Sequence, residues 1–157
     1  MSKHEIEKLQ EISNTLRRIN AKLTLFSLLR QAKSEYEENN YDNCAEICQQ
    51  ILDSNPDNSV ALRGLGCVAQ ANGNFKLALK YYKKALKTSL NKEIEYTLIG
   101  TLYYLEDKYE KAVKYFNLAI DVNDEYDEAY EGKSQSILEK HLQILDLQDS
   151  LIKKELL

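Results

Sequence analysis

The stretch Gly73–Leu86 reads GNFKLALKYYKKAL, and a similar stretch, DKYEKAVKYFNLAI, begins at Asp107. A third copy, NNYDNCAEICQQIL, begins at Asn39, so the three copies follow one another at a constant interval. Each copy has an aromatic residue third, a small residue sixth and an apolar pair at its end. A period of about 34 residues is the length of two short helices with their turns, so the sequence predicts a repeated helical hairpin.

The spacing inside each copy is that of a helix packed against a close neighbour. Ala78, Tyr82 and Ala85 are spaced i, i+4 and i+7, which places them on one helical face. In the preceding segment a small residue recurs in phase, at Ala32, Gly66 and Gly100. The turns ENNY, NGNF and EDKY contain residues that tolerate left-handed backbone. One such hairpin cannot bury both faces, so neighbours must stack, and the repeat predicts a helical solenoid.

The segment from Leu25 to Asp124 resembles three tandem tetratricopeptide repeats, on the residues LRGLGCVAQANGNFKLALKYYKKAL and YTLIGTLYYLEDKYEKAVKYFNLAI. The resemblance implies an all-α fold, a right-handed helical solenoid (an α–α superhelix) with an extra helix at each end. It divides the chain into an N-terminal helix, three repeats and a C-terminal partial repeat or capping helix, at residues 1–24, 25–58, 59–92, 93–126 and 127–157. The alternative is an antiparallel helix bundle with accidental periodicity.

Both ends of the chain carry apolar patterns outside the repeats. Between residues 3 and 23 a stripe spaced by threes and fours predicts a helix, with Ile6, Leu9, Ile12, Leu16, Ile19 and Leu23 on one side. This helix either caps the first repeat or joins two copies of the chain. After Asp124 a long terminal helix is expected to cover the last repeat. Tyr130 and Ser134 are in phase with a fourth repeat, and the broad apolar arc beyond them suits a partner or a second copy.

Composition narrows the function classes. The formal net charge of −4 argues against binding a nucleic-acid backbone. The lysines of the stretch at Gly73 are expected on a solvated outer face. Three cysteines without framework spacing suit a reducing, cytoplasmic location. The charged start of the chain has no apolar core typical of a secretory signal, and no apolar run is long enough to span a membrane.

The resemblance implies that the first helices line a concave groove that binds a segment of a partner protein. The expected groove residues are Phe26, Leu29, Arg30, Lys33, Tyr36, Val60, Arg63, Gly64, Cys67, Gln70, Ile94, Thr97, Leu98, Thr101 and Tyr104. Small residues in the middle and large ones around it suit an extended or helical segment with apolar anchors. The alternative is that the terminal helix of the same chain fills the groove.

Some tetratricopeptide proteins clamp the C-terminal carboxylate of heat-shock chaperones with Lys, Arg and Asn. The aligned residues here are Leu29, Lys33, Gly64, Ile94 and Leu98. Only one of them is basic, so the set of donors that forms this clamp is missing and this role is excluded. The layout also resembles that of the class II chaperones of type III secretion.

No arrangement of residues predicts catalysis, a metal or a cofactor. The two histidines, His4 and His141, lie near opposite ends of the chain. Cys44 and Cys48 occupy core positions of the first repeat and are expected to be buried structural thiols. The sequence therefore predicts a non-enzymatic protein-interaction module, an adaptor or chaperone. The alternative is a scaffold or homodimer in which the terminal helices make the contacts.

Overall fold

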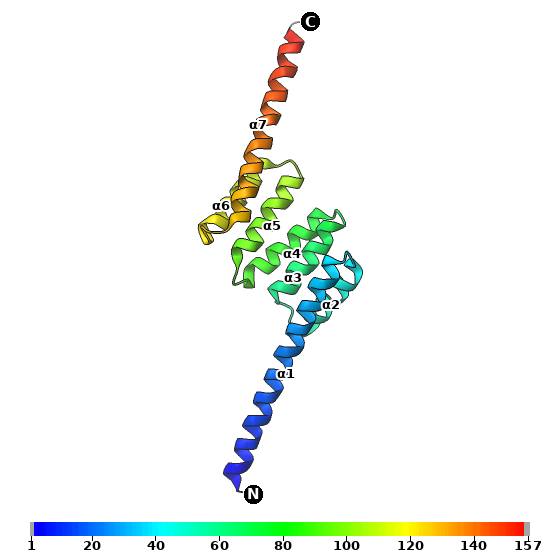
Figure 1. The fold of residues 1–157 in the computed structure, drawn as a ribbon, viewed down its shortest axis with the longest axis vertical. Helices are drawn as coiled ribbons and strands as arrows, with labels where there is room; N and C mark the ends of the chain where they lie inside the picture. The colour runs from blue at the N-terminus through cyan, green and yellow to red at the C-terminus, as the bar shows by residue number, and fades with distance from the viewer. Residues whose placement is uncertain (1, 156–157) are drawn as a thin grey trace.

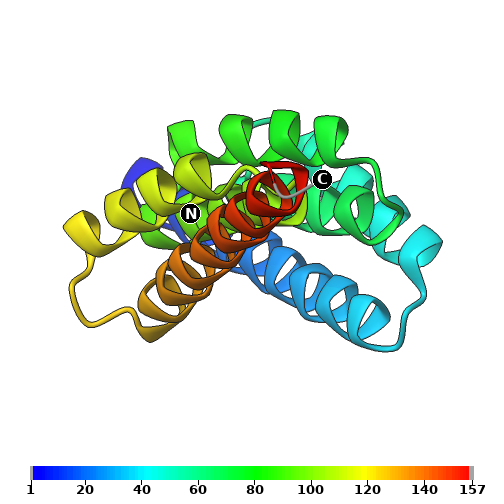
Figure 2. The same cartoon turned by 90° about the horizontal axis from the view of Figure 1, so that it is seen from above.

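The computed structural model describes residues 2–155, and within this range the regular structure consists of seven helices and no strand. They are α1 (Lys3–Glu37), α2 (Tyr41–Ser54), α3 (Ser59–Ala71), α4 (Phe75–Thr88), α5 (Lys92–Leu105), α6 (Tyr109–Val122) and α7 (Asp127–Glu155). Helices α1 and α2, α3 and α4, and α5 and α6 form three hairpins that pack in chain order, and α7 packs on α5 and α6 (Figure 1). The prediction of an all-α helical solenoid is confirmed. Figure 2, seen along the long axis, shows the body as an arc of helices.

The predicted turns inside the hairpins have the same backbone geometry in all three repeats. Asn39, Gly73 and Asp107, which are equivalent positions of the repeat, have positive φ values of 62°, 74° and 57°. After each of them, the next amide N–H donates back to a carbonyl of the ending helix. The three hydrogen bonds are Asn40 to Glu35, Asn74 to Ala69 and Lys108 to Tyr103, at 2.8, 2.8 and 2.9 Å. This is the Schellman end of a helix, which turns the chain sharply into the second helix.

Glycine and an aromatic ring together set the distance between the two helices of a hairpin. A Cβ atom on Gly66 would overlap the ring of Tyr82, and one on Gly100 would lie 2.9 Å from Cε1 of Phe116. Tyr82 and Phe116 are almost fully buried. In the first repeat the same two positions hold Ala32 and Cys48, both buried. Ala32 is larger than the glycine of the other repeats, and Cys48 is smaller than their aromatic residue. Together they fill the same space between the two helices.

Helix α1 is one uninterrupted helix of 35 residues, so it does not end near residue 24. Helix α2 has only 14 residues and covers only the C-terminal part of α1. Residues 3–24 are almost all exposed and project from the body (Figure 1). The predicted stripe from Ile6 to Leu23 is therefore on a helix, but its side chains are 40–62% exposed. The alternative in which this helix caps the first repeat is contradicted, because nothing turns the helix back onto the body.

Helix α7 takes the place of the first helix of a fourth repeat. Ala129 and Ser136 are fully buried, and a Cβ atom on Gly132 would overlap the ring of Phe116 on α6. Tyr130 and Ser134 are in phase with the first helix of a fourth repeat, as predicted. They are exposed because no second helix of that repeat follows α7 within the described residues. The terminal helix thus covers the last repeat, as predicted, and then projects from the body (Figure 1).

Candidate functional site

A pocket of about 410 Å³ lies where α1, α2 and α3 meet. The residues that line it are Phe26, Leu29, Arg30, Ala32, Lys33, Tyr36, Cys44, Cys48, Val60, Arg63, Gly64 and Cys67. They include every groove residue expected from the first repeat and most of those expected from the second. No α7 residue lines the pocket, so the alternative in which the terminal helix of the same chain fills this part of the groove is contradicted.

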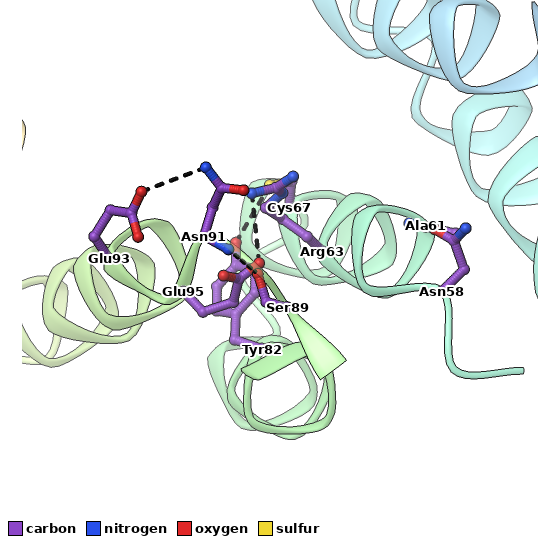
Figure 3. Close-up of polar contacts among 9 residues, drawn as sticks. All are labelled: Asn58, Ala61, Arg63, Cys67, Tyr82, Ser89, Asn91, Glu93 and Glu95. Atoms are coloured by element: carbon purple, nitrogen blue, oxygen red, sulfur yellow. Dashed lines mark hydrogen bonds and ion pairs between the residues drawn. The ribbon is translucent and has the colours of Figure 1, made fainter. Parts of the chain in front are cut away.

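The floor of the pocket depends on a close approach of α3 to α2. Asn58 starts α3 by accepting the amide N–H of Ala61 on its Oδ1 atom at 3.0 Å (Figure 3). A Cβ atom on Gly64 would lie 2.6 Å from Sγ of Cys48, which is closer than side chains pack. Glycine at this position therefore brings the two helices together and leaves the pocket above them open.

Three free thiols lie under or beside the pocket, at Cys44, Cys48 and Cys67. Burial raises the pKa of the Cys48 thiol to about 12, and burial also raises the pKa of Cys44 and Cys67. At neutral pH these groups are therefore protonated, weakly nucleophilic and close to apolar in character. They contribute surface for an apolar ligand and not a reactive centre.

All three charged residues that line the pocket are basic: Arg30, Lys33 and Arg63. Lys33 forms a helix-surface pair with Glu37 at 3.5 Å, and both side chains are well exposed. Nζ of a surface lysine in such a pair is held weakly. The pocket therefore combines an apolar floor with a positively charged edge.

Arg63 is held by a carboxylate that sequence reasoning did not single out. Its Nη1 atom lies 3.4 Å from Oε1 of Glu95 on α5, and Figure 3 shows the two side chains pointing toward one another. The Glu95 side chain is fully buried, and neither of its oxygens has a hydrogen-bond partner among the described residues. The sequence does carry a signal for Glu95, because this charged residue is at a repeat position where Ala61 and Ala129 are buried alanines.

Gln70 was expected to face a ligand, but it is engaged with the core. The Tyr82 hydroxyl donates to Oε1 of Gln70 at 2.8 Å and lies 3.5 Å from Sγ of Cys67. Burial, and then the neighbouring Cys67, raise the pKa of Tyr82. These contacts of the Tyr82 hydroxyl hold Gln70 and Cys67 of α3 on the side that faces the core.

The groove residues expected from the third repeat do not line the pocket. Leu98 packs on the core around Tyr82, and the Thr101 hydroxyl donates to the Thr97 carbonyl at 3.0 Å. Tyr104 leans on the ring of Tyr109 with 5.6 Å between centroids, and Ile94 is half-buried. The structure thus brings together the first two repeats at one site and leaves the third outside it.

No group of three or more His, Cys, Asp or Glu side chains in residues 2–154 is arranged to hold a metal ion. None of the helices in this range is both long and apolar enough to cross a bilayer.

The hairpins, their regular period and the groove define a helical-repeat protein of the interaction type. Models of the tetratricopeptide repeat match residues 26–58, 64–92 and 96–126, which together are more than half of the chain. The chain belongs to the tetratricopeptide repeat family.

Solved structures with this fold include both binding modules and parts of enzymes. A Thermobaculum terrenum O-GlcNAc transferase mutant is 22% identical with a TM-score of 0.68, over 74% of this chain. The chain spans only 22% of that transferase chain.

Two other structures were solved with a bound segment. PcrH in complex with the chaperone binding region of PopD is 16% identical with a TM-score of 0.67, over 78% of this chain and 95% of that one. The first repeat domain of Spaghetti (RPAP3), bound to an HSP90 peptide, is 16% identical with a TM-score of 0.65, over 72% and 90%. At these identities the likeness concerns the fold.

Proposed function

We propose that this protein is a non-catalytic interaction module that binds a segment of a partner protein in the groove over α1, α2 and α3. The observation that carries the proposal is an open pocket of about 410 Å³ with an apolar floor. The ring of Phe26 at its edge is 61% exposed. A ligand that covers this exposed aromatic ring and the apolar pocket beside it removes apolar surface from water. This burial favours binding.

Two of the structural neighbours support this function by analogy. The PcrH structure contains the chaperone binding region of PopD, and the Spaghetti domain contains an HSP90 peptide. An adaptor or chaperone role is the corresponding proposal for this chain. The proposed groove continues from the pocket residues Phe26, Arg63 and Cys67 toward Thr97 and Tyr104 of the third repeat, which do not line the pocket. The three free thiols fit a reducing compartment such as the cytoplasm.

The groove proposal predicts the loss of a partner when the pocket walls become polar. Phe26→Asn/Val60→Asn changes two exposed wall residues, 61% and 42% exposed, without touching the core. A tagged wild-type chain is expected to capture a partner from a lysate of the source organism, and the variant is expected to lose it. Circular dichroism of the variant should match that of the wild type.

The matched control is Leu77→Asn/Leu90→Asn, which makes the same chemical change at exposed leucines away from the pocket. This control should keep every partner. A partner retained by the groove variant, or lost equally by both variants, would contradict groove binding.

A second candidate function is a homodimeric or assembly scaffold. The observation that favours it is the pair of projecting helices with exposed apolar side chains, Ile6 to Leu23 on α1 and Ile137 to Ile152 on α7. If α1 joins two copies, the full chain should be a dimer in light scattering and a chain lacking residues 1–22 should be a monomer. An unchanged mass would remove the N-terminal part of α1 from any interface.

A further inference from the structure

We propose that the pocket recognises an Asp or Glu carboxylate placed beside a bulky apolar side chain in the same partner segment. This inference rests on the proposed groove function and adds the chemistry of its ligand. The apolar side chain fills the pocket, and the carboxylate lies on the basic edge formed by Arg30, Lys33 and Arg63.

The charged side chains that line the pocket are all basic. Arg30 is exposed and has no ion-pair partner among the side chains of residues 2–154. Lys33 has only the exposed Glu37 beside it, a pair that contributes little and gives way easily to another carboxylate. A ligand carboxylate therefore meets two exposed cations on α1, one of which has no competing partner among the residues described.

Arg63 is the third cation, and it is already in place before a ligand arrives. Its side chain is 22% exposed toward the pocket that it lines, while the buried Glu95 holds one end of the guanidinium at 3.4 Å (Figure 3). A planar guanidinium presents several N–H donors in a fixed fork, so anchoring one end leaves other donors directed outward. Pre-ordering of this kind lowers the entropy lost on binding.

The floor of the pocket does not oppose a nearby carboxylate. The pocket is lined by the thiols of Cys44, Cys48 and Cys67, which are protonated and carry no negative charge at neutral pH. Tyr36, which also lines the pocket, has its pKa raised by burial and is likewise neutral. The carboxylate of the buried Glu95 is paired with Arg63. The bulky side chain and the carboxylate can therefore bind next to each other.

The experiment is a selection of random twelve-residue peptides displayed as fusions through their C-termini, so that no free C-terminal carboxylate is present. They are selected on the wild type and counter-selected on Phe26→Asn/Val60→Asn. Peptides that bind the wild type but not this variant are called groove-dependent. They are expected to be enriched in Asp or Glu within four residues of Leu, Ile, Phe, Met or Trp. Groove-dependent peptides without acidic enrichment would overturn this inference and leave the proposed function standing. A selection that yields no groove-dependent peptide would contradict both.

A matched pair of synthetic peptides then measures the charge directly. The best selected peptide is compared with its Asn or Gln counterpart by fluorescence anisotropy. The acid is expected to bind the wild type at least about tenfold more tightly, as hydrogen bonds to charged groups allow. In Arg30→Ser/Lys33→Ser this preference should fall to about threefold or less. The control Lys83→Ser/Lys87→Ser, which removes two exposed lysines from α4, should keep it. Equal binding of acid and amide to the wild type, or an undiminished preference in the Arg30/Lys33 variant, would overturn the inference.

Discussion

Replacing Arg63 with methionine is expected to lower the free energy of unfolding by about 3–5 kcal/mol, because it leaves the carboxylate of Glu95 buried without a counter-charge. Glu95 is fully buried and has no hydrogen bond within the described residues to compensate. Urea denaturation followed by far-ultraviolet circular dichroism measures the loss.

The double variant Arg63→Met/Glu95→Leu distinguishes the lost charge pair from lost packing. Replacing both members of a buried ion pair by apolar residues of similar size is often neutral or stabilising. The double variant should therefore be at least as stable as the wild type to within about 1 kcal/mol. If it is as unstable as Arg63→Met alone, the pair does more than neutralise Glu95, and the account of the buried carboxylate is wrong.

Truncating Phe116 to alanine is expected to cost about 3–5 kcal/mol, the usual range for removing a fully buried ring. Phe116 is 2% exposed and lies between Gly100 of α5 and Gly132 of α7. No side chain at either glycine can move into the space that the ring vacates. The cavity therefore stays open, and the contact that holds α7 on the last repeat is lost.

Two measurements check this expectation beyond the overall stability. Hydrogen exchange of residues 127–136 should become faster in Phe116→Ala than in the wild type, because this part of α7 packs on the ring. The same substitution at Phe26, which is 61% exposed, should change the free energy of unfolding by less than about 0.5 kcal/mol. A loss below about 1 kcal/mol for Phe116→Ala would contradict its place as the central contact of the last repeat.

The repeat itself could be predicted in detail because its period depends on local rules. The turn residues Asn39, Gly73 and Asp107 and the paired Gly66 and Tyr82 follow from backbone conformation and from sterics inside one hairpin. Such features depend only on residues within the short stretch of sequence that forms a single hairpin. Their recurrence in phase over three periods made each one an independent check on the others.

Features that depend on several elements at once could not be predicted. The stripe on α1 predicted a helix, but its exposure depends on α2 being too short to cover it. Gly132 is not at the glycine position of the other repeats; it is at the position of Gly64 and Leu98, which faces the preceding repeat. The burial of Glu95 depends on Arg63, which belongs to the neighbouring repeat. Only the stacked solenoid brings such residues together.

The projecting parts of α1 and α7 are long, rigid arms attached to the two ends of the solenoid. The free part of α1, residues 3–24, is about 33 Å long at the usual helical rise, and α1 and α7 project toward opposite extremes of the molecule (Figure 1). A change of about 10° in the curvature of the solenoid would move the tip of such an arm by about 6 Å. If a ligand in the groove changes this curvature, the change becomes a displacement at the ends of the arms, which a donor and acceptor dye pair would record.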